Sequence, residues 1–498
     1  YDDKKGLGWA IDDTKNNNTP LWRWNITSQE WEKSVLEARG DKNPLLAFLQ
    51  TGVTNENNIG VTGNYDKGSF RFNVGNVVAN SVVPSNKTTR TDVSLSAIYK
   101  LTDKITITSD ASYSRTFVPN QSHLQDKRED NPLAHAMAMP INMPKMSVWK
   151  QANHWLNGWE GTYQNTPYLK NPGASRLSLV DKNGFDKAIG KNGPYFAAEE
   201  VIRTYSRDVV FGRAQMDWKI IEPLTFTLRS GLTHEAFVFE RKTPWGSERA
   251  EKGGYEMQMS NSVGVKNDVM LAFNKYFLDN KLSVDVLVGS AYNFGQSNSS
   301  SFSGNELTTP NSFNFGSLPA SVRQSANFSN GYASRNYSTY GTASVGWKSQ
   351  VYLEMSGRND WVGILPHEKD HHFYPGVSVS WLLSETFKEK LTWASLLKLR
   401  AGYAETGYGI GHPVNLDSYG ISGSTWGSVP YGTLGGDLYD ANIKPELNVT
   451  KEAGIDFGVL NNRISGEFTV YRKDHINQIQ GLPVVGSTGF SNVMTNMG

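Results

Sequence analysis

The chain has 498 residues, and 49 Lys and Arg against 48 Asp and Glu give a net charge of +1. This balance provides no positive field to attract nucleic acid, and the lack of cysteine excludes disulfides and thiolate metal sites. The mean hydropathy is −0.48, and without a run of ~18 apolar residues the sequence predicts no transmembrane helix. Aromatic residues at 12 % and 47 glycines favour an all-β fold rich in turns.

A strict alternation of apolar and polar residues runs through much of the chain. In KITITSDASYSRTF, residues 104–117, apolar side chains occupy odd positions and most even positions are polar. A period of two is typical of a β-strand with one apolar face. The pattern recurs in other segments: SFRFNV, DVSLSAIYKL, LTFTLRSGL, KLSVDVLVGSAYNF, QVYLEMSGRND, GVSVSW, LKLRAGY, AGIDFGV and RISGEFTV. We predict about fourteen strands, several of them longer than the ~5–6 residues usual in globular proteins.

Short and long connections alternate between these strands. Short turns are expected at 65–68, 102–104, 221–223, 278–281, 347–350 and 460–463. Longer polar, glycine-rich stretches are expected at 119–205, 242–253, 303–331, 362–373 and 406–446. This alternation is typical of a transmembrane antiparallel β-barrel, with tight periplasmic turns and long extracellular loops. The apolar face of each strand would then meet lipid, and the polar face a water-filled or plugged lumen.

A soluble β-sandwich or propeller also has alternating strands, and it stays open as an alternative. Two features favour the barrel. Charged residues that a dry sandwich core would exclude stand mid-strand on the polar face: Arg229, Glu354, Lys398, Arg400 and Glu467. Aromatic residues gather near strand ends, where interfacial girdles lie: Tyr113, Phe117, Trp218, Trp347 and Trp381. Arg358 and Asp360 share the polar face, where we expect pairing across neighbouring strands or contact with substrate.

The long loops hold the candidate residues for contact with a ligand or a partner. They are Trp155, Trp159, Tyr163 and Tyr168 in the first long loop, and Trp426 and Tyr431 in the last. Their flat amphipathic rings suit stacking on sugar rings or packing against a partner. Packing of each loop on itself is the competing interpretation, because a long loop needs a core of its own. Asn131 and Pro132 predict the cap and first turn of a short helix.

The sequence gives little support to a metal site or to catalysis. The segment HEKDHH holds metal-capable side chains, His367, Glu368, Asp370, His371 and His372, but adjacent histidines on a short loop have no fixed ligand geometry. No Gly-x-Ser-x-Gly elbow, P-loop or His-Glu-x-x-His pattern is present. We therefore predict no metal site, no cofactor, no catalytic residue and no enzymatic activity.

Several stretches carry a more specific signal through their order and spacing. They are FLQTGVTNENNIGVTGNYDKGSFRFNVGN (48–76), VVPSNKTTRTDVSLSAIYKLTDKITITSDASYS (82–114), SGRNDWVGILPHEKDHHFYPGVSVSWLLSE (356–385), LLKLRAGYAETG (396–407), IKPELNVTKEAGIDFG (443–458), NRISGEFTVYRKDHINQI (462–479) and TGFSNVMTNMG (488–498). Together they resemble the SusC/RagA-like family of TonB-dependent outer-membrane transporters from Bacteroidetes, over about residues 43–498.

The resemblance implies a barrel of ~22 strands behind an N-terminal plug and a TonB box. We expect residues 1–56 to be a post-plug segment with the first extracellular loop, and 57–498 to be a partial barrel domain with large extracellular loops at 119–205, 303–331 and 406–446. The chain would then be a fragment that lacks the plug and the final strands, since an open sheet edge cannot face lipid.

The same resemblance implies active import of oligosaccharides or oligopeptides across the bacterial outer membrane. The implied partners are a SusD-like surface lipoprotein that acts as a lid, and TonB through the absent plug region. A passive porin and a soluble carbohydrate-binding β protein remain alternatives. A receptor for metal chelates is disfavoured, because siderophore receptors do not share the pattern at 48–72.

Overall fold

The structure is a computed structural model of residues 1–498. It describes residues 43–124, 131–138, 194–245, 252–324, 326–329, 333–362, 371–408, 419–427, 429–434, 436–440 and 442–497, with residues 247, 249, 250 and 331. It also describes the strands β1 (Leu21–Asn25), β2 (Glu30–Ser34) and β7 (Ser178–Leu179), which form a small separate sheet.

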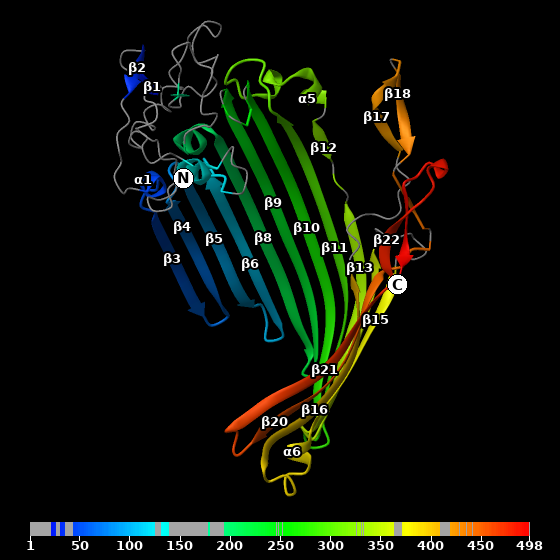
Figure 1. The fold of residues 1–498 in the computed structure, drawn as a ribbon. Coiled ribbons are helices and arrows are strands. Elements are labelled where there is room, and N and C mark those ends of the chain that lie inside the picture. Colours follow the sequence, from blue (N-terminus) through cyan, green and yellow to red (C-terminus); the bar gives the residue numbers. More distant parts are fainter. Residues whose placement is uncertain are drawn as a thin grey trace.

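One antiparallel sheet dominates the fold (Figure 1). Fourteen strands follow one another along it: β3 (Val53–Tyr65), β4 (Gly68–Asn80), β5 (Lys87–Lys100), β6 (Ile105–Val118), β8 (Ile202–Ile221), β9 (Leu224–Trp245), β10 (Lys252–Phe277), β11 (Leu282–Gly304), β13 (Ser334–Trp347), β14 (Val351–Val362), β15 (His371–Leu382), β16 (Ala394–Tyr408), β20 (Glu446–Val459) and β21 (Ile464–Ile476). β12 (Asn327–Ser329) pairs with β11 off this path. The edges are β3 and β21, and no strand in the described ranges joins them.

Six of the seven connections at one end of the sheet are tight, as predicted, while the seventh, between β15 and β16, spans residues 383–393. β3 passes to β4 through residues 66–67, β8 to β9 through 222–223 and β13 to β14 through 348–350. The other three predicted short turns separate β5 from β6, β10 from β11, and β20 from β21. Figure 1 shows these turns together at the lower end of the sheet, while the long connections gather at the upper end. The prediction of an all-β sheet of about fourteen antiparallel strands with alternating short and long connections is confirmed.

The register carries the two-residue period across the whole sheet. Ile105, Ile107 and Tyr113 of β6 pair with Trp218, Met216 and Val210 of β8, so apolar side chains share one face, here called the outer face. The opposite face, here called the inner face, pairs Asp110 with Arg213. Because side chains alternate across a strand, this register separates an apolar surface from a polar one.

The apolar surface has a defined height. On β6 the outer face is largely apolar from Ile105 to Tyr113 and then carries Arg115, opposite Asp208 of β8. On the other edge the border is formed by Lys451 of β20 opposite Arg472 of β21. This height matches the ~9–11 residues that a tilted membrane-spanning strand needs. Trp218, Trp347 and Trp381 lie exposed on the outer face near the tight turns, where the lower aromatic girdle was predicted.

The long connections build small cores of their own above the sheet. Phe48, Val83, Ala136, Tyr195 and Ala198 form one buried cluster that joins α1 (Pro44–Phe48), α2 (Pro132–Ala138) and the π-helix η3 (Phe196–Glu200). Asn131 Oδ1 accepts hydrogen bonds from the backbone N–H of Leu133 and Ala134, which confirms the predicted cap of α2. Tyr255, Leu307 and Leu318 form a second cluster beside η4 (Phe315–Ser317) and α5 (Ala320–Gln324), above the β10–β11 hairpin.

The remaining elements are short. α6 (Leu383–Thr386) connects β15 to β16, and η6 (Gly486–Thr488) follows β22 (Gln478–Pro483). β22, β23 (Asn492–Met497) and β19 (Asp437–Tyr439) form a three-stranded sheet, while β17 (Tyr419–Trp426) and β18 (Val429–Leu434) pair with each other. No helix in the part of the chain that the structure describes has the length and apolar character to cross a membrane.

Candidate functional site

The polar inner face is the candidate site, because its side chains line two hollows of the sheet. One hollow of about 750 Å³ extends from β10 to β20, and another of about 500 Å³ extends from β8 to β11. One row of register partners crosses six neighbouring strands, from β8 to β14. Its members in order are Gln215, Arg229, Asp268, Ala291, Ser338 and Asp360. The β-sheet thus brings residues from distant parts of the chain onto one polar wall.

Arg229 and Asp268 form an ion pair of this wall whose carboxylate is buried. Arg229 Nη2 lies 3.0 Å from Asp268 Oδ2, and Arg229 Nε donates to the same oxygen. The side chain of Asp268 is only 4 % exposed, against 35 % for Arg229. A buried carboxylate needs such a partner, since an unpaired charge is costly away from water. Arg229 therefore has a structural role on the inner face where the sequence placed it.

Arg358 and Asp360 lie close together on β14. Arg358 Nε is 2.6 Å from Asp360 Oδ1, so the ion pair runs along one strand. The contact with the neighbouring strand is a hydrogen bond of 2.8 Å from Arg358 Nη2 to Ser338 Oγ. The guanidinium also lies 5.6 Å from the ring centre of Tyr340. The expected pairing across strands is thus made through a hydroxyl and a ring, and the carboxylate is on the same strand.

A second charged cluster joins the last strands of the sheet. Asp456 of β20 lies 3.4 Å from Arg400 Nε and 3.8 Å from Lys398 Nζ, both on β16. Arg400 Nη2 lies 3.5 Å from Glu467 on β21 and donates a hydrogen bond of 2.7 Å to Thr469 Oγ1. Three predicted inner-face residues, Lys398, Arg400 and Glu467, therefore share one cluster with Asp456.

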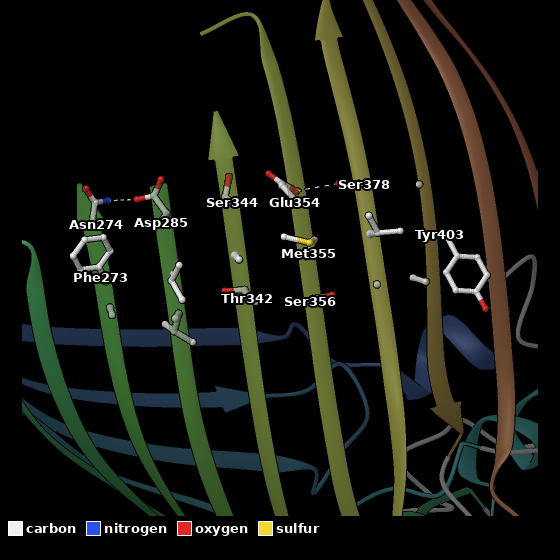
Figure 2. A pocket seen from close by; sticks show the side chains of 18 of the residues that line it. Phe273, Asn274, Asp285, Thr342, Ser344, Glu354, Met355, Ser356, Ser378 and Tyr403 are labelled. Carbon is white, nitrogen blue, oxygen red and sulfur yellow. Dashed lines mark hydrogen bonds between the residues drawn. The ribbon is translucent and has the colours of Figure 1, made fainter. Parts of the chain in front are cut away.

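Glu354 lies apart from both clusters, in the larger hollow (Figure 2). Its Oε2 accepts a hydrogen bond of 3.3 Å from Ser378 Oγ. Asn274 and Asp285, which line the same hollow, are hydrogen-bonded to each other. Neither the carboxylate of Glu354 nor that of Asp285 has a cation within ion-pair distance among the described residues. This lower part of the wall is acidic and lined by small polar side chains.

The predicted loop residues fall into two groups. Trp155, Trp159, Tyr163 and Tyr168 lie outside the described residues, as do His367, Glu368 and Asp370. Trp426 and Tyr431 belong to the β17–β18 hairpin, which projects from the upper end of the sheet in Figure 1, and their side chains are 85 % and 43 % exposed. Their contact with a ligand or partner stays a prediction. Within the described ranges, no group of three or more His, Cys, Asp or Glu side chains is placed to hold a metal ion.

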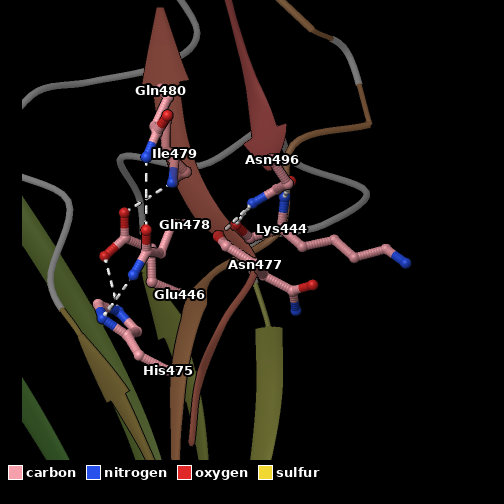
Figure 3. A network of polar contacts seen from close by, with 8 residues as sticks. All are labelled: Lys444, Glu446, His475, Asn477, Gln478, Ile479, Gln480 and Asn496. Atoms are coloured by element: carbon pink, nitrogen blue, oxygen red, sulfur yellow. Dashed lines mark hydrogen bonds and ion pairs between the residues drawn. The ribbon is translucent and has the colours of Figure 1, made fainter. Parts of the chain in front are cut away.

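A polar network at the upper end of β20 and β21 joins the main sheet to the segment that follows it in the chain (Figure 3). Glu446 Oε2 lies 3.3 Å from His475 Nε2, and Glu446 Oε1 accepts a hydrogen bond of 2.7 Å from the Ile479 N–H. Asn496 Nδ2 donates to the carbonyl oxygens of Asn477 and Lys444. Nearby, hydrogen bonds from the Asn442 N–H and the Thr495 hydroxyl hold the pKa of Asp440 below its usual value.

Asn477 is the bend between β21 and β22, with a φ of 59° in the left-handed region. Asn477→Ala is expected to destabilise the β22–β23 segment by ~1 kcal/mol, because a β-carbon disfavours this conformation in residues other than Gly and Asn. Asn477→Gly is the matched control and should leave it unchanged. Hydrogen exchange of residues 478–497 in the full-length protein is the measurement. Equal exchange in the Ala and Gly variants would contradict this role for the bend.

Residues 148–498 match the family of TonB dependent receptor-like β-barrels. The chain belongs to this family. It is 23 % identical over 466 residues to the TonB-dependent receptor P39 of Formosa agariphila, covering 91 % of this chain and 40 % of that protein. It is 28 % identical over 175 residues to the TonB-dependent receptor SusC of Bacteroides thetaiotaomicron, covering 33 % of this chain and 17 % of SusC.

The fold is similar to that of the RagAB peptide transporter, with a TM-score of 0.70 at 14 % identity over 93 % of this chain and 49 % of that chain. The sequence-based assignment to SusC/RagA-like TonB-dependent transporters is confirmed by these matches. The chain is an outer-membrane β-barrel sequence, and its family is one of transporters and receptors. It spans less than half the length of each relative named here.

Proposed function

We propose that the polypeptide containing this chain imports oligosaccharides or oligopeptides across the outer membrane, driven by TonB. The observation that carries the proposal is the inner face: a continuous polar wall with paired charges, built on strands whose outer face is apolar. Such a wall is suited to a wide hydrated lumen, since a dry core would exclude these charges. Membership of the TonB-dependent receptor family and the likeness to the RagAB peptide transporter support import of nutrients across the outer membrane.

A SusD-like lipoprotein lid is the second part of this proposal. β10 and β11 are 26 and 23 residues long, far more than the ~9–11 residues that a span needs. The upper end of β10 is joined to β9 by an ion pair of 2.6 Å between Arg241 of β9 and Glu256 of β10, whose side chains are 9 % and 16 % exposed. A rigid extracellular rim of this kind is a suitable support for a lid. Trp426 and Tyr431 are the described aromatic side chains that we propose for lid or ligand contact.

Uptake in living cells tests the proposal. Cells carrying the full-length protein should accumulate labelled oligosaccharides or oligopeptides, and uptake should fall to background when TonB is removed or the proton gradient is collapsed. A passive porin would continue to conduct, because diffusion requires neither. Uptake that persists without TonB would therefore refute active import. Deletion of the partner lipoprotein should reduce uptake while leaving the amount of barrel in the membrane unchanged.

A further inference from the structure

We propose that the inner face carries a binding subsite for the anionic group of an acidic oligosaccharide, centred on Gly231. The subsite lies in the hollow of about 500 Å³ between β8 and β11. The inference rests on the proposed import of oligomers, and it specifies one class of them: sugars that carry a carboxylate or a sulfate.

The register surrounds Gly231 with three cationic side chains. Arg213 of β8 and Lys266 of β10 are its direct partners on either side. Arg229 precedes it by two residues on β9, so its side chain leaves the same face. A β-carbon at Gly231 would come no closer than 3.8 Å to a neighbouring atom. Gly231 therefore leaves a space without side chains between Arg213 and Lys266, here called the open floor. The backbones of Arg213 and Lys266 lie two strand spacings apart, or ~10 Å.

Of these three cations, Lys266 is the one that forms no ion pair with a described residue. The carboxylate of Asp110 pairs with Arg213, with 2.5 Å between Nη2 and Oδ2, and that of Asp268 pairs with Arg229. Lys266 is exposed, and it forms no ion pair with any residue in the described part of the chain. The three cations thus have only two carboxylates as partners, and the positive charge of Lys266 is left beside the open floor. An anion placed there would meet a charge-assisted donor without displacing an internal partner.

Phe211 adds an apolar surface beside these charges. It is 40 % exposed on the polar inner face, opposite Thr233 and two residues from Arg213 on the same strand. Gly264 extends the open floor, since a β-carbon there would have no neighbour closer than 4.0 Å. A flat ring beside a floor without side chains suits the face of a pyranose, and Thr233 and Asn293 supply polar atoms for hydroxyl groups.

The same geometry disfavours an acidic peptide. Each strand from β8 to β11 is paired on both sides. The wall therefore offers no unpaired backbone groups for the strand addition by which extended peptides gain most of their hydrogen bonds. Recognition must come from side chains alone, which favours a sugar with a charged substituent.

Amine labelling of Lys266 in the full-length protein, read by mass spectrometry, tests the subsite directly. The probes are hexagalacturonate, a sulfated carrageenan hexasaccharide, maltohexaose and hexaglutamate, each at millimolar concentration. We expect at least one acidic sugar to protect Lys266, while Lys281, an exposed lysine in the turn of the same β10–β11 hairpin, stays reactive. Protection by only hexagalacturonate or only the sulfated sugar would assign a carboxylate or a sulfate.

Binding of the protecting sugar should weaken about tenfold in Lys266→Gln, which is one ion contact, and by less than about threefold in Lys266→Arg and Lys281→Gln. The proposal is overturned if no acidic sugar protects Lys266, if maltohexaose or hexaglutamate protects it equally, or if Lys266 is unreactive without any probe because another part of the polypeptide covers it. These outcomes leave TonB-dependent uptake untouched, so the inference and the proposed function fail in separate experiments.

Discussion

Val288→Arg is expected to destabilise the membrane-inserted protein by about 2–4 kcal/mol, the range for a cation on the lipid face of a barrel near the bilayer midplane. Val288 lies on the outer face of β11, opposite Leu271 and Gly341, and is 50 % exposed. Its strand begins at Leu282 near the tight turn, and the aromatic residue Tyr292 lies four positions above it. Hydrocarbon offers the guanidinium no hydrogen-bond partner at this depth.

Thr342→Arg is the matched control for this prediction. Thr342 is adjacent to the register partner of Val288, but it lies on the inner face opposite Leu287 and is exposed to the larger hollow. An arginine there would stand in water and should change stability by less than ~0.5 kcal/mol. Urea unfolding of the full-length protein in lipid vesicles measures both variants. A neutral Val288→Arg beside a destabilising Thr342→Arg would reverse the two faces and remove the basis of the transport assignment.

The local pattern of the sequence was sufficient to predict the strands. In residues 104–117 the alternation places Ile105, Ile107 and Tyr113 on one face, and the structure pairs them with an apolar row of β8. Tight turns are also local features, because a hairpin turn and its flanking strands are adjacent in the chain. A period of two therefore determines which side chains share a face before any tertiary contact is known.

The partners on the inner face were not predictable in the same way. Arg213 and Asp110 are separated by 103 positions, and Arg229 and Asp268 by 39. Long connections of unknown path stand between most of these strands. The odd or even position of a residue therefore predicts its face of the strand, but not its partner on the neighbouring strand. The buried cluster of Phe48, Val83, Ala136 and Tyr195 has the same origin: it joins separate segments that share no periodic signal.

A signal for the subsite of the inner face does exist in the sequence, and the prediction of charged wall residues did not use it. Phe211 is an apolar residue at a position whose parity is polar in the stretch VVFGRAQMDW. Gly231 and Gly264 interrupt neighbouring strands on the same face. A break in the alternation indicates a position where the residue type does not follow the polarity of its face of the sheet, as is expected at a functional site.

Arg229→Met is expected to cost about 3 kcal/mol in the free energy of unfolding, because it leaves a carboxylate that is only 4 % exposed without its partner. Asp268 is held from one side by Arg229 and has no second cation within ion-pair distance among the described residues. The methionine replaces most of the apolar stem of the arginine, so the change removes charge more than packing.

Arg213→Met provides the comparison that isolates burial. Arg213 and Asp110 form the same kind of pair on the same face, one row away, but the side chain of Asp110 is 25 % exposed. Water can solvate that carboxylate after the change, so the expected cost is ~1 kcal/mol or less. Denaturant unfolding of both full-length variants in detergent gives the two values. Equal losses would show that the strength of these pairs does not depend on burial.

The double variant Arg229→Met/Asp268→Leu completes this test. Removing both charges leaves an apolar pair in place of a buried ion pair, which is often close to neutral in stability. We therefore expect the double variant to regain most of what Arg229→Met loses. A double variant as unstable as the single one would mean that Arg229 acts through its packing, and that the carboxylate of Asp268 does not require compensation. Recovery would instead show that the loss of stability comes from the unpaired carboxylate of Asp268. It would explain why an arginine stands mid-strand at this position of the polar wall.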